Sequence, residues 1–243
     1  MSSPAKRRIA VVTGGARRLG RHLCLSLSAR GYDVVCVYRT SADAAQSLAR
    51  DIAAAGGRAR TVKVDVAARQ EVAAAFAGIA ASEGRVDLLV NNVGNYNPQD
   101  VTELDPTVWD ATLSANLSGA YYCCYHAIPL MVNGGSIVSI GMAGLEGIRA
   151  NRRGADYYVS KTGLLVLTRA LAAGYADRKI RVNMISPGQL DNSVDLPAPE
   201  DIRRFVPIGR SGTVEDIAQA LHYLLDATYV TGANIDVAGG YRL

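Results

Sequence analysis

Tyr157 and Lys161 are the residues whose types and spacing most directly suggest chemistry. They lie four residues apart in a segment that predicts a helix from about Ala155, so their side chains share one face. A phenol titrates near pH ~10 in water, but a neighbouring ammonium stabilises the phenolate and lowers its pKa. The pair is therefore a candidate proton donor. Tyr158 is a competing phenol without the four-residue spacing, and the spacing alone also fits a chance helical pair.

These two residues need a scaffold, and the hydropathy pattern predicts one of alternating strands and helices. Apolar strands are predicted at 9–12, 34–37, 61–64, 88–90, 136–140, 181–185 and 234–237. Helices are predicted from about 19, at 42–55 and 71–82, within 109–132, and at 155–176 and 214–225. Such alternation is typical of an α/β fold with a parallel sheet covered on both faces. We expect one domain over residues 1–243, with 189–199 as a loop or lid.

The turn after the first predicted strand has the composition of a phosphate-binding loop. It reads Thr13-Gly14-Gly15-Ala16-Arg17-Arg18-Leu19-Gly20 and leads into the first predicted helix. Glycines allow the backbone to approach a pyrophosphate closely, and a helix N-terminus offers N–H groups to it. The strand-turn-helix context therefore predicts a dinucleotide site.

The end of the second predicted strand indicates which dinucleotide binds. A carboxylate is expected there if the ribose hydroxyls of NAD are bound, but the segment reads Tyr38-Arg39-Thr40-Ser41. Arg39 and Arg17 could instead hold a 2′-phosphate, for which a planar guanidinium is well suited. The alternative is that both arginines are only solvated. NADP(H) is the predicted cofactor.

Composition excludes several other classes of function. The net charge is +4 and the basic residues are scattered, so no nucleic-acid-binding stripe is indicated. No apolar run reaches the length of a signal-peptide core or a membrane span, and we expect a cytoplasmic protein without membrane or metal partners. The four cysteines form no C-x-x-C pair and lie in apolar segments, which favours buried reduced thiols; they are Cys24, Cys36, Cys123 and Cys124.

With these segments placed, the chain resembles a classical short-chain dehydrogenase/reductase over nearly its whole length. The matching segments, in order, are Thr13–Gly20, Asp65-Val66, Asn91-Asn92-Val93-Gly94, Asn116, Tyr157-x-x-x-Lys161, Pro187-Gly188, Pro207–Arg210, Glu215–Ala218, Val230–Gly232 and Gly239-Gly240. The resemblance implies a single Rossmann-type doubly wound domain with a mostly parallel seven-stranded sheet. It also implies a homotetramer or homodimer, compatible with the apolar segment 121–128.

The resemblance implies a role for each matching residue. Tyr157 would give a proton to a carbonyl or imine, Lys161 would tune it and bind the nicotinamide ribose, and Asn116 would hold a relay water. The cofactor would be lined by Gly14, Arg17, Arg18, Leu19, Gly20, Arg39, Thr40, Asp65, Val66, Asn92, Gly94, Tyr157, Lys161, Pro187 and Gly188.

The chain departs from the family pattern at two places. Arg18 replaces the usual middle glycine of the nucleotide turn, a variant similar to pteridine reductases and dihydromonapterin reductases, which fits NADP(H). The family's catalytic serine, about 13 residues before the tyrosine, is missing: its place falls on Gly141, Met142 or Gly144. Ser139 comes too early and is expected inside the sheet layer. Nearby polar residues that could replace the serine are Asn95, Tyr96, Tyr158 and Asn192.

Two hypotheses of function follow. The first is an NADPH-dependent reductase of a carbonyl (a ketone or β-ketoacyl compound) or imine. The second is an NADP-binding protein of the same fold with impaired or non-redox activity, such as a sensor or scaffold. The basic segment with Arg149, Arg152 and Arg153 fits an acidic substrate, but it fits an exposed charged loop better. The substrate itself is not indicated.

Overall fold

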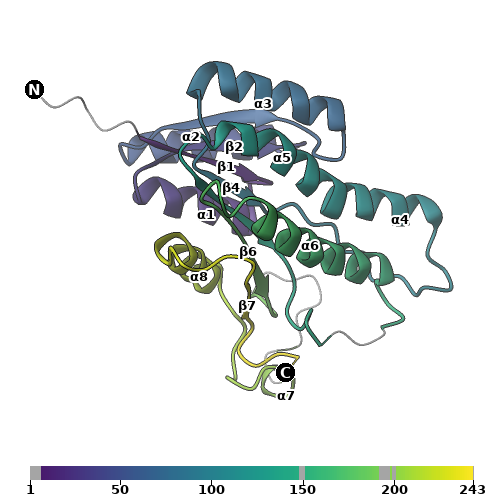
Figure 1. Ribbon diagram of the computed structural model, residues 1–243. Helices are drawn as coiled ribbons and strands as arrows, with labels where there is room; N and C mark the ends of the chain where they lie inside the picture. The colour runs from purple at the N-terminus through teal and green to yellow at the C-terminus, as the bar shows by residue number, and fades with distance from the viewer. Residues whose placement is uncertain (1–6, 148–150, 192–197, 199–200, 243) are drawn as a thin grey trace, which may run out of the picture.

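A seven-stranded parallel sheet forms the centre of the computed structural model, which describes residues 7–147, 151–191, 198 and 201–242. The strand order is β3-β2-β1-β4-β5-β6-β7, and every neighbouring pair is parallel (Figure 1). The strands are β1 (Arg8–Thr13), β2 (Tyr32–Tyr38), β3 (Ala59–Lys63), β4 (Leu88–Asn91), β5 (Gly135–Ile140), β6 (Ile180–Pro187) and β7 (Asn234–Val237). The chain order reverses between β1 and β4, which is where ligands bind in sheets of this kind.

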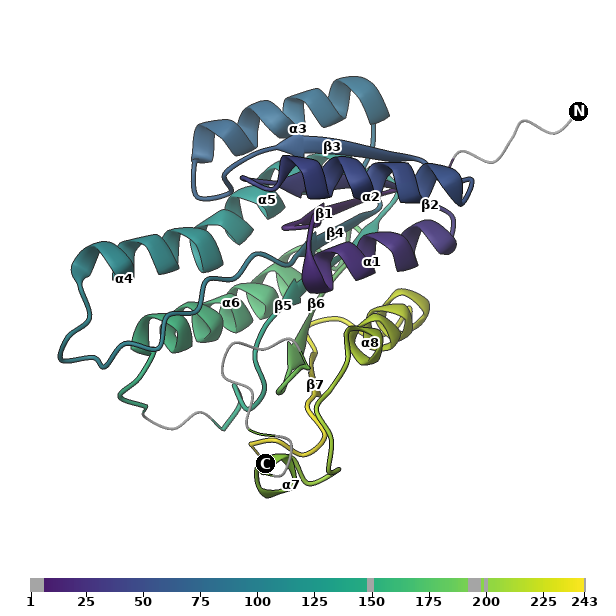
Figure 2. The ribbon, with the colours of Figure 1, turned by 180° about the vertical axis from the view of Figure 1, so that it is seen from behind.

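Helices cover both faces of the sheet, as Figures 1 and 2 show from opposite sides. The helices are α1 (Arg18–Ala29), α2 (Ala42–Ala54), α3 (Arg69–Glu83), α4 (Pro106–Leu113), α5 (Gly119–Ala127), α6 (Ala155–Gly174), α7 (Ile202–Phe205) and α8 (Val214–Asp226). One core joins α1, α2 and α8 to one face of the sheet, and a second joins α3 and α5 to the other.

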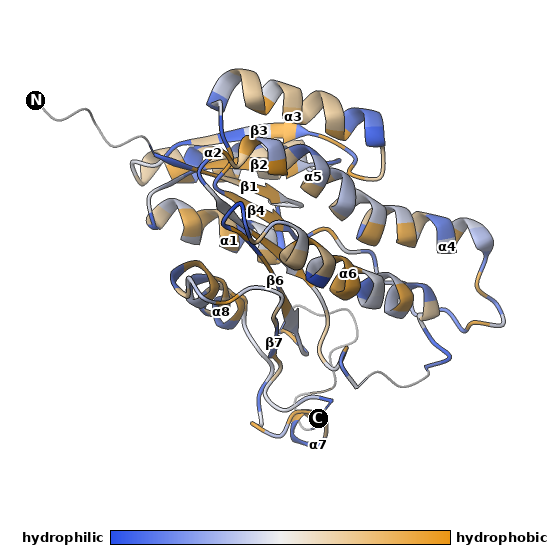
Figure 3. Ribbon diagram, in the orientation of Figure 1, coloured by the Kyte–Doolittle hydropathy of each residue, from blue (hydrophilic) through white to orange (hydrophobic). Residues whose placement is uncertain are grey.

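Strand alternation explains the two cores. Ala10 and Val12 of β1 belong to the first core, whereas Ile9 and Val11 belong to the second, and all four are at most 4% exposed. Successive side chains of a strand point to opposite faces, and burying an aliphatic side chain stabilises by roughly 1.5–3 kcal/mol. In Figure 3 the helices α1, α6 and α8 show apolar and polar sides, as expected for helices with one face on the sheet.

The predicted α/β fold and its strands are confirmed, while the helical region 109–132 is not one regular helix. A π-helical turn, η1 (Ser114–Ser118), separates α4 from α5, and a 3₁₀ turn, η2 (Ile128–Leu130), ends the region. Such π-turns often mark functional positions, and η1 contains Asn116. The short helix α7 was not predicted, because four residues carry too little periodicity to be recognised.

Other predictions have mixed outcomes. All four cysteines are free and buried, as expected. Asn192, Arg149 and most of the 189–199 segment lie outside the described residues. Ser139 is 2% exposed within β5, in agreement with a structural role. Among the described helices, none has both the length and the hydropathy that crossing a bilayer requires.

Candidate active site

The glycines of the predicted phosphate loop meet its physical requirements. Gly14 has φ of +62°, in the left-handed region that glycine adopts at little cost. A Cβ on Gly20 would lie 2.1 Å from the carbonyl oxygen of Gly14, so the first turn of α1 can pack on the loop only without a side chain there. The Asn92 side chain donates hydrogen bonds to the carbonyls of Thr13 and Gly14 at 3.1 and 3.2 Å. Asn92 thus shapes the loop from β4 as well as lining the cleft.

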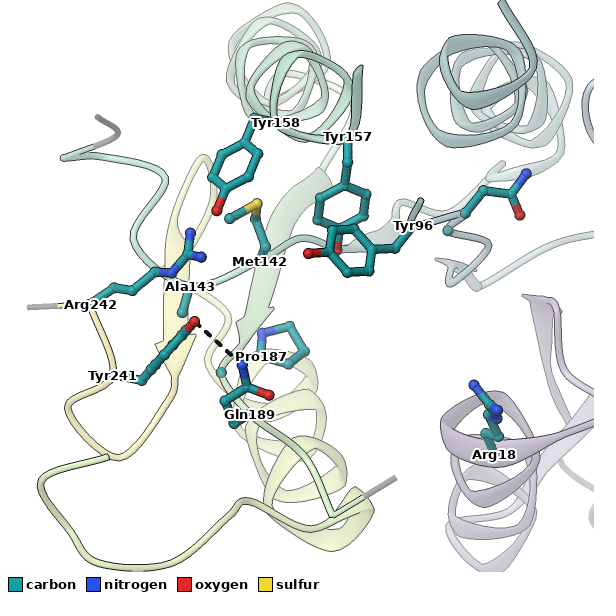
Figure 4. Close-up of a pocket in the computed structure, with 13 residues that line it drawn as sticks. Arg18, Tyr96, Met142, Ala143, Tyr157, Tyr158, Pro187, Gln189, Tyr241 and Arg242 are labelled. Carbon is teal, nitrogen blue, oxygen red and sulfur yellow. Dashed lines mark hydrogen bonds between the residues drawn. The ribbon is translucent and has the colours of Figure 1, made fainter. Parts of the chain in front are cut away.

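Arg18 occupies the position of the missing middle glycine with the backbone that a glycine would have. Its φ is +48°, in the left-handed region that a side chain with a Cβ adopts only at a cost. Its side chain lies at the border of two cavities and lines both of them. The substitution therefore places a guanidinium between the phosphate loop and the space in front of Tyr157 (Figure 4).

A cavity of about 200 Å³ lies at the carboxyl ends of β1, β2 and β3. Its lining includes Arg17, Arg39, Thr40, Asp65 and Val66, all predicted cofactor residues. The described part of the chain places two arginines and one acid here, and the Arg39 guanidinium approaches the Asp65 carboxylate at 3.5 Å. Arg39 is 59% exposed at its side chain, so this ion pair is weak and open to exchange with a phosphate.

A second cavity, of about 570 Å³, continues from the phosphate loop to the predicted catalytic pair. The remaining predicted cofactor residues line it: Gly14, Leu19, Gly20, Asn92, Gly94, Tyr157, Lys161, Pro187 and Gly188. A Cβ on Gly94 would lie 3.2 Å from the Lys161 ammonium nitrogen, and one on Gly188 would lie 2.8 Å from the Cα of Ala238. Gly94 thus leaves room beside the Lys161 ammonium, and Gly188 lets the chain after β6 pack closely on Ala238, so the residues present fit an extended dinucleotide.

Lys161 is held at the floor of this cavity by the main chain. Its Nζ donates a hydrogen bond of 2.7 Å to the carbonyl of Ile140, at the end of β5, and the residue is 2% exposed. Burial lowers the pKa of Lys161 from 10.5 to about 8, because the charged form loses hydration. Nζ lies 5.7 Å from the centre of the Tyr157 ring. The structure thus brings the two predicted catalytic residues together.

Asn116 joins the catalytic helix to the loop after β4. Its Oδ1 accepts a hydrogen bond of 2.7 Å from the Asn95 N–H, and its Nδ2 donates to the Asn95 carbonyl at 2.9 Å. Nδ2 also approaches Ser160 Oγ at 3.1 Å, and Ser160 Oγ donates to the Tyr157 carbonyl at 2.7 Å. Sequence reasoning missed Ser160, since a serine inside a helix has no spacing signal of its own. The relay water at Asn116 stays a prediction.

The space in front of Tyr157 is a third cavity, of about 550 Å³ (Figure 4). Its wall includes residues that were not predicted, among them Gln189, Tyr241 and Arg242. The Gln189 amide donates to the Tyr241 hydroxyl at 3.3 Å, and the Arg242 guanidinium carbon lies 5.2 Å from the centre of the Tyr158 ring. The C-terminal segment reaches the site only through the fold, so no local signal could have revealed it.

Only one of the three possible serine positions directs a side chain into this third cavity. A Cβ on Gly141 would lie 2.5 Å from Ser186 Oγ, and one on Gly144 would lie 3.0 Å from the Arg242 Cβ. Met142 instead lines the cavity, and Figure 4 shows its side chain between Tyr157 and Tyr158. The thioether of Met142 donates no hydrogen bond.

Known proteins resemble this chain over almost its whole length. A family model described as enoyl-(acyl carrier protein) reductase matches residues 14–242. The 3β-hydroxysteroid dehydrogenase 1 of Eggerthella lenta is 35% identical, with 100% of this chain and 97% of the relative covered. The 3-oxoacyl-[acyl-carrier-protein] reductase FabG of Staphylococcus epidermidis is 31% identical, with 95% and 97% covered.

Solved structures agree with these relatives. A short-chain dehydrogenase/reductase of Serratia marcescens superposes with a TM-score of 0.92 at 31% identity, covering 99% of this chain and 100% of that one. A blue fluorescent protein from a metagenomic library, in complex with NADPH, superposes with a TM-score of 0.90 at 31% identity, covering 97% and 98%. None of these four proteins tests the likeness of the nucleotide turn to pteridine reductases, which stays a prediction. The chain belongs to the classical short-chain dehydrogenase/reductase family, and it is an NAD(P)-dependent oxidoreductase of that family.

Proposed function

We propose that the protein is an NADPH-dependent reductase of a carbonyl compound, a ketone or β-ketoacyl compound, or of an imine. The first two cavities are named the cofactor cavities here, and the third cavity, in front of Tyr157, is named the substrate cavity. The observation that carries this proposal is the Lys161 ammonium, which is buried beside Tyr157 where the second cavity meets the substrate cavity. A buried ammonium destabilises the fold, because its charge loses hydration. It is useful where a phenolate forms during turnover.

Tyr157 is the proton donor in this proposal, and Lys161 makes its proton available. NADPH, when bound, supplies a hydride to the electrophilic carbon of the substrate. The electron pair of the C=O or C=N bond moves to the heteroatom, which takes the Tyr157 proton. The Lys161 ammonium stabilises the resulting phenolate. Asn116 links the Asn95 main chain to Ser160 in the second turn of α6 through its hydrogen bonds, and so holds the loop and the helix together.

The preference for NADPH over NADH rests on the end of β2. The segment 38–41 has no carboxylate to bind ribose hydroxyls, and it presents Arg39 beside Arg17. A 2′-phosphate would replace the weak Asp65 contact of Arg39 by a charge-assisted pair of greater strength.

The substrate cavity favours a neutral or anionic compound. The described residues of its wall include four tyrosines and two arginines but no aspartate or glutamate. The Eggerthella relative is named for a hydroxysteroid and the Staphylococcus relative for an acyl-carrier-protein thioester. Ketosteroids and β-ketoacyl thioesters are therefore the first compounds to test, with quinones and dihydropterins as further classes.

Tyr157→Phe tests the proposal. The variant should lose NADPH oxidation with the best substrate of the panel while still quenching or enhancing NADPH fluorescence on binding. Turnover that survives in this variant would mean that Tyr157 is not the acid. If the unaltered protein turns over none of these compounds yet binds NADPH, the result favours the second hypothesis, an NADP-binding protein with impaired or non-redox activity.

We also propose assembly into a homodimer or homotetramer through α5 and α6. Their surfaces expose Tyr121, Tyr125, Val159 and Val166 by 45%, 59%, 47% and 64%. Apolar residues gathered on neighbouring helices favour an interface. Sedimentation equilibrium tests this, and a monomer at micromolar concentration would contradict it.

A further inference from the structure

The family pattern places a second hydrogen-bond donor to the reacting oxygen at Gly141, Met142 or Gly144, and of these only Met142 lines the substrate cavity. With Met142 in the cavity wall, Tyr157 is left as one donor where the family pattern has two. Removing a single preorganised donor from such a site costs on the order of 10²–10³ in rate. An efficient enzyme would therefore take the second donor from another residue.

Tyr96 is the phenol best placed to be that donor. Its ring centre lies 5.0 Å from that of Tyr157, with the ring planes at 66° in an edge-to-face arrangement. Both side chains line the substrate cavity, and they reach it from different elements, α6 and the loop after β4. Figure 4 shows the two rings together, pointing into the same part of the cavity. The Tyr96 phenol is thus a candidate for a second contact with an oxygen bound to the Tyr157 hydroxyl.

The Tyr96 backbone is held on both sides by the catalytic machinery. On the N-terminal side, both main-chain polar groups of Asn95 are hydrogen-bonded to the Asn116 side chain. On the C-terminal side, the Gln99 carbonyl accepts a 2.8 Å hydrogen bond from the N–H of Gly154, the residue just before α6. A donor fixed in this way needs little reorganisation during the reaction.

The Tyr96 ring packs beside Gly154, where the absence of a side chain leaves it room. A Cβ there would lie 3.2 Å from the Tyr96 Cε2 atom. Gly154 has φ of +74°, so glycine is favoured at this position by its backbone as well. The residue just before the helix of Tyr157 therefore also makes room for the ring of Tyr96.

The other candidates fit less well. The Tyr158 ring centre lies 6.4 Å from that of Tyr157, farther than the Tyr96 ring, and the Tyr158 ring packs under the Arg242 guanidinium. Asn95 lines the two cofactor cavities as well as the substrate cavity, so it lies on the cofactor side of the site. Asn192 lies outside the described residues.

We propose that the Tyr96 hydroxyl donates the second hydrogen bond to the reacting oxygen and so replaces the serine. Tyr96 keeps its proton throughout: the proton that ends on the product comes from Tyr157, and no covalent bond of Tyr96 changes. This inference rests on the proposed reductase function. It assigns substrate contact to a residue outside the family's matching segments.

Tyr96→Phe is the first test, because it removes the hydroxyl and keeps the ring that packs on Tyr157 and Gly154. The expected result is a loss in kcat/KM on the order of 10²-fold, with NADPH affinity unchanged. Tyr158→Phe should lose less, and Tyr229→Phe, at a fully exposed position, should match the unaltered protein. Full kcat/KM in Tyr96→Phe would overturn the inference.

Met142→Ser provides the rescue. In the Tyr96→Phe background, Met142→Ser should raise kcat/KM at least tenfold. In the protein that keeps Tyr96, the same substitution should raise kcat/KM by a smaller factor. Equal effects in both backgrounds would contradict a shared role for the two positions. If Tyr157→Phe is inactive while Tyr96→Phe is fully active, the reductase proposal stands and only this inference fails.

A readout without cofactor or substrate completes the test. A hydroxyl that donates toward the Tyr157 oxygen stabilises its phenolate, so Tyr96→Phe should raise the pKa of Tyr157. The Tyr157 titration is obtained from tyrosinate absorbance as the difference between each protein and its Tyr157→Phe partner. An unchanged titration would argue against a hydroxyl placed beside that of Tyr157.

Discussion

The buried ammonium of Lys161 should leave a measurable signature in the pH dependence of stability. Burial lowers its pKa from 10.5 to about 8 in the folded protein. Below pH 8 both states are charged and the folded state carries the whole desolvation cost. As pH rises from about 8 towards 10.5, the folded state loses its proton before the unfolded state does, so stability rises with pH.

The size of this effect follows from the same shift. At about 1.36 kcal/mol per pKa unit, a fall from 10.5 to about 8 corresponds to about 3 kcal/mol in the free energy of unfolding. Little screening by solvent applies, because Lys161 is 2% exposed. Lys161→Met removes the titration. The protein that keeps Lys161 should therefore gain about 3 kcal/mol relative to this variant between pH 7.5 and 10.5.

Urea unfolding at a series of pH values, under reducing conditions, measures this difference. Both proteins carry Tyr157→Phe, because Lys161 tunes the titration of Tyr157, and the titrations of the other tyrosines and cysteines then largely cancel. Lys63→Met, at an exposed lysine on the edge strand β3, is the matched control and should show no such slope. A flat difference between the Lys161→Met variant and the protein that keeps Lys161, or one that falls with pH, would refute the argument that Lys161 is an ammonium forced into a poorly hydrated site.

Four further outcomes are expected. The kcat/KM for reduction should fall as pH rises above about 8, because Lys161 loses its charge; a pH–rate profile that stays level to pH 10 would contradict this. Arg39→Ala should raise the KM for NADPH roughly 10–100-fold and leave that for NADH little changed, as initial rates with each cofactor will show. Gly20→Ala should abolish binding of either dinucleotide, measured by cofactor fluorescence, because its Cβ would lie 2.1 Å from the Gly14 carbonyl oxygen. Arg242→Gln should reduce kcat/KM about 10-fold more for a carboxylate-bearing ketone than for its neutral ester, and equal losses would show that Arg242 does not read substrate charge.

The strands, most helices and the nucleotide loop could be predicted from the sequence because their signals are local. Apolar runs such as 88–90, the glycines around Arg17 and the spacing of Tyr157 to Lys161 each lie within a few residues of one another. Hydropathy, backbone freedom and helix geometry act at that range. The family resemblance then joined these local signals into an expected site.

The details of the substrate cavity were decided by tertiary structure alone. Whether Gly141, Met142 or Gly144 faces the cavity depends on the side chains of Ser186 and Arg242, which leave only Met142 in the cavity wall. Side-chain directions in such a loop depend on what packs against it from distant parts of the chain. The meeting of Tyr96 with Tyr157, and the arrival of the C-terminal segment beside Tyr158, depend in the same way on contacts across 61 and 84 residues of sequence.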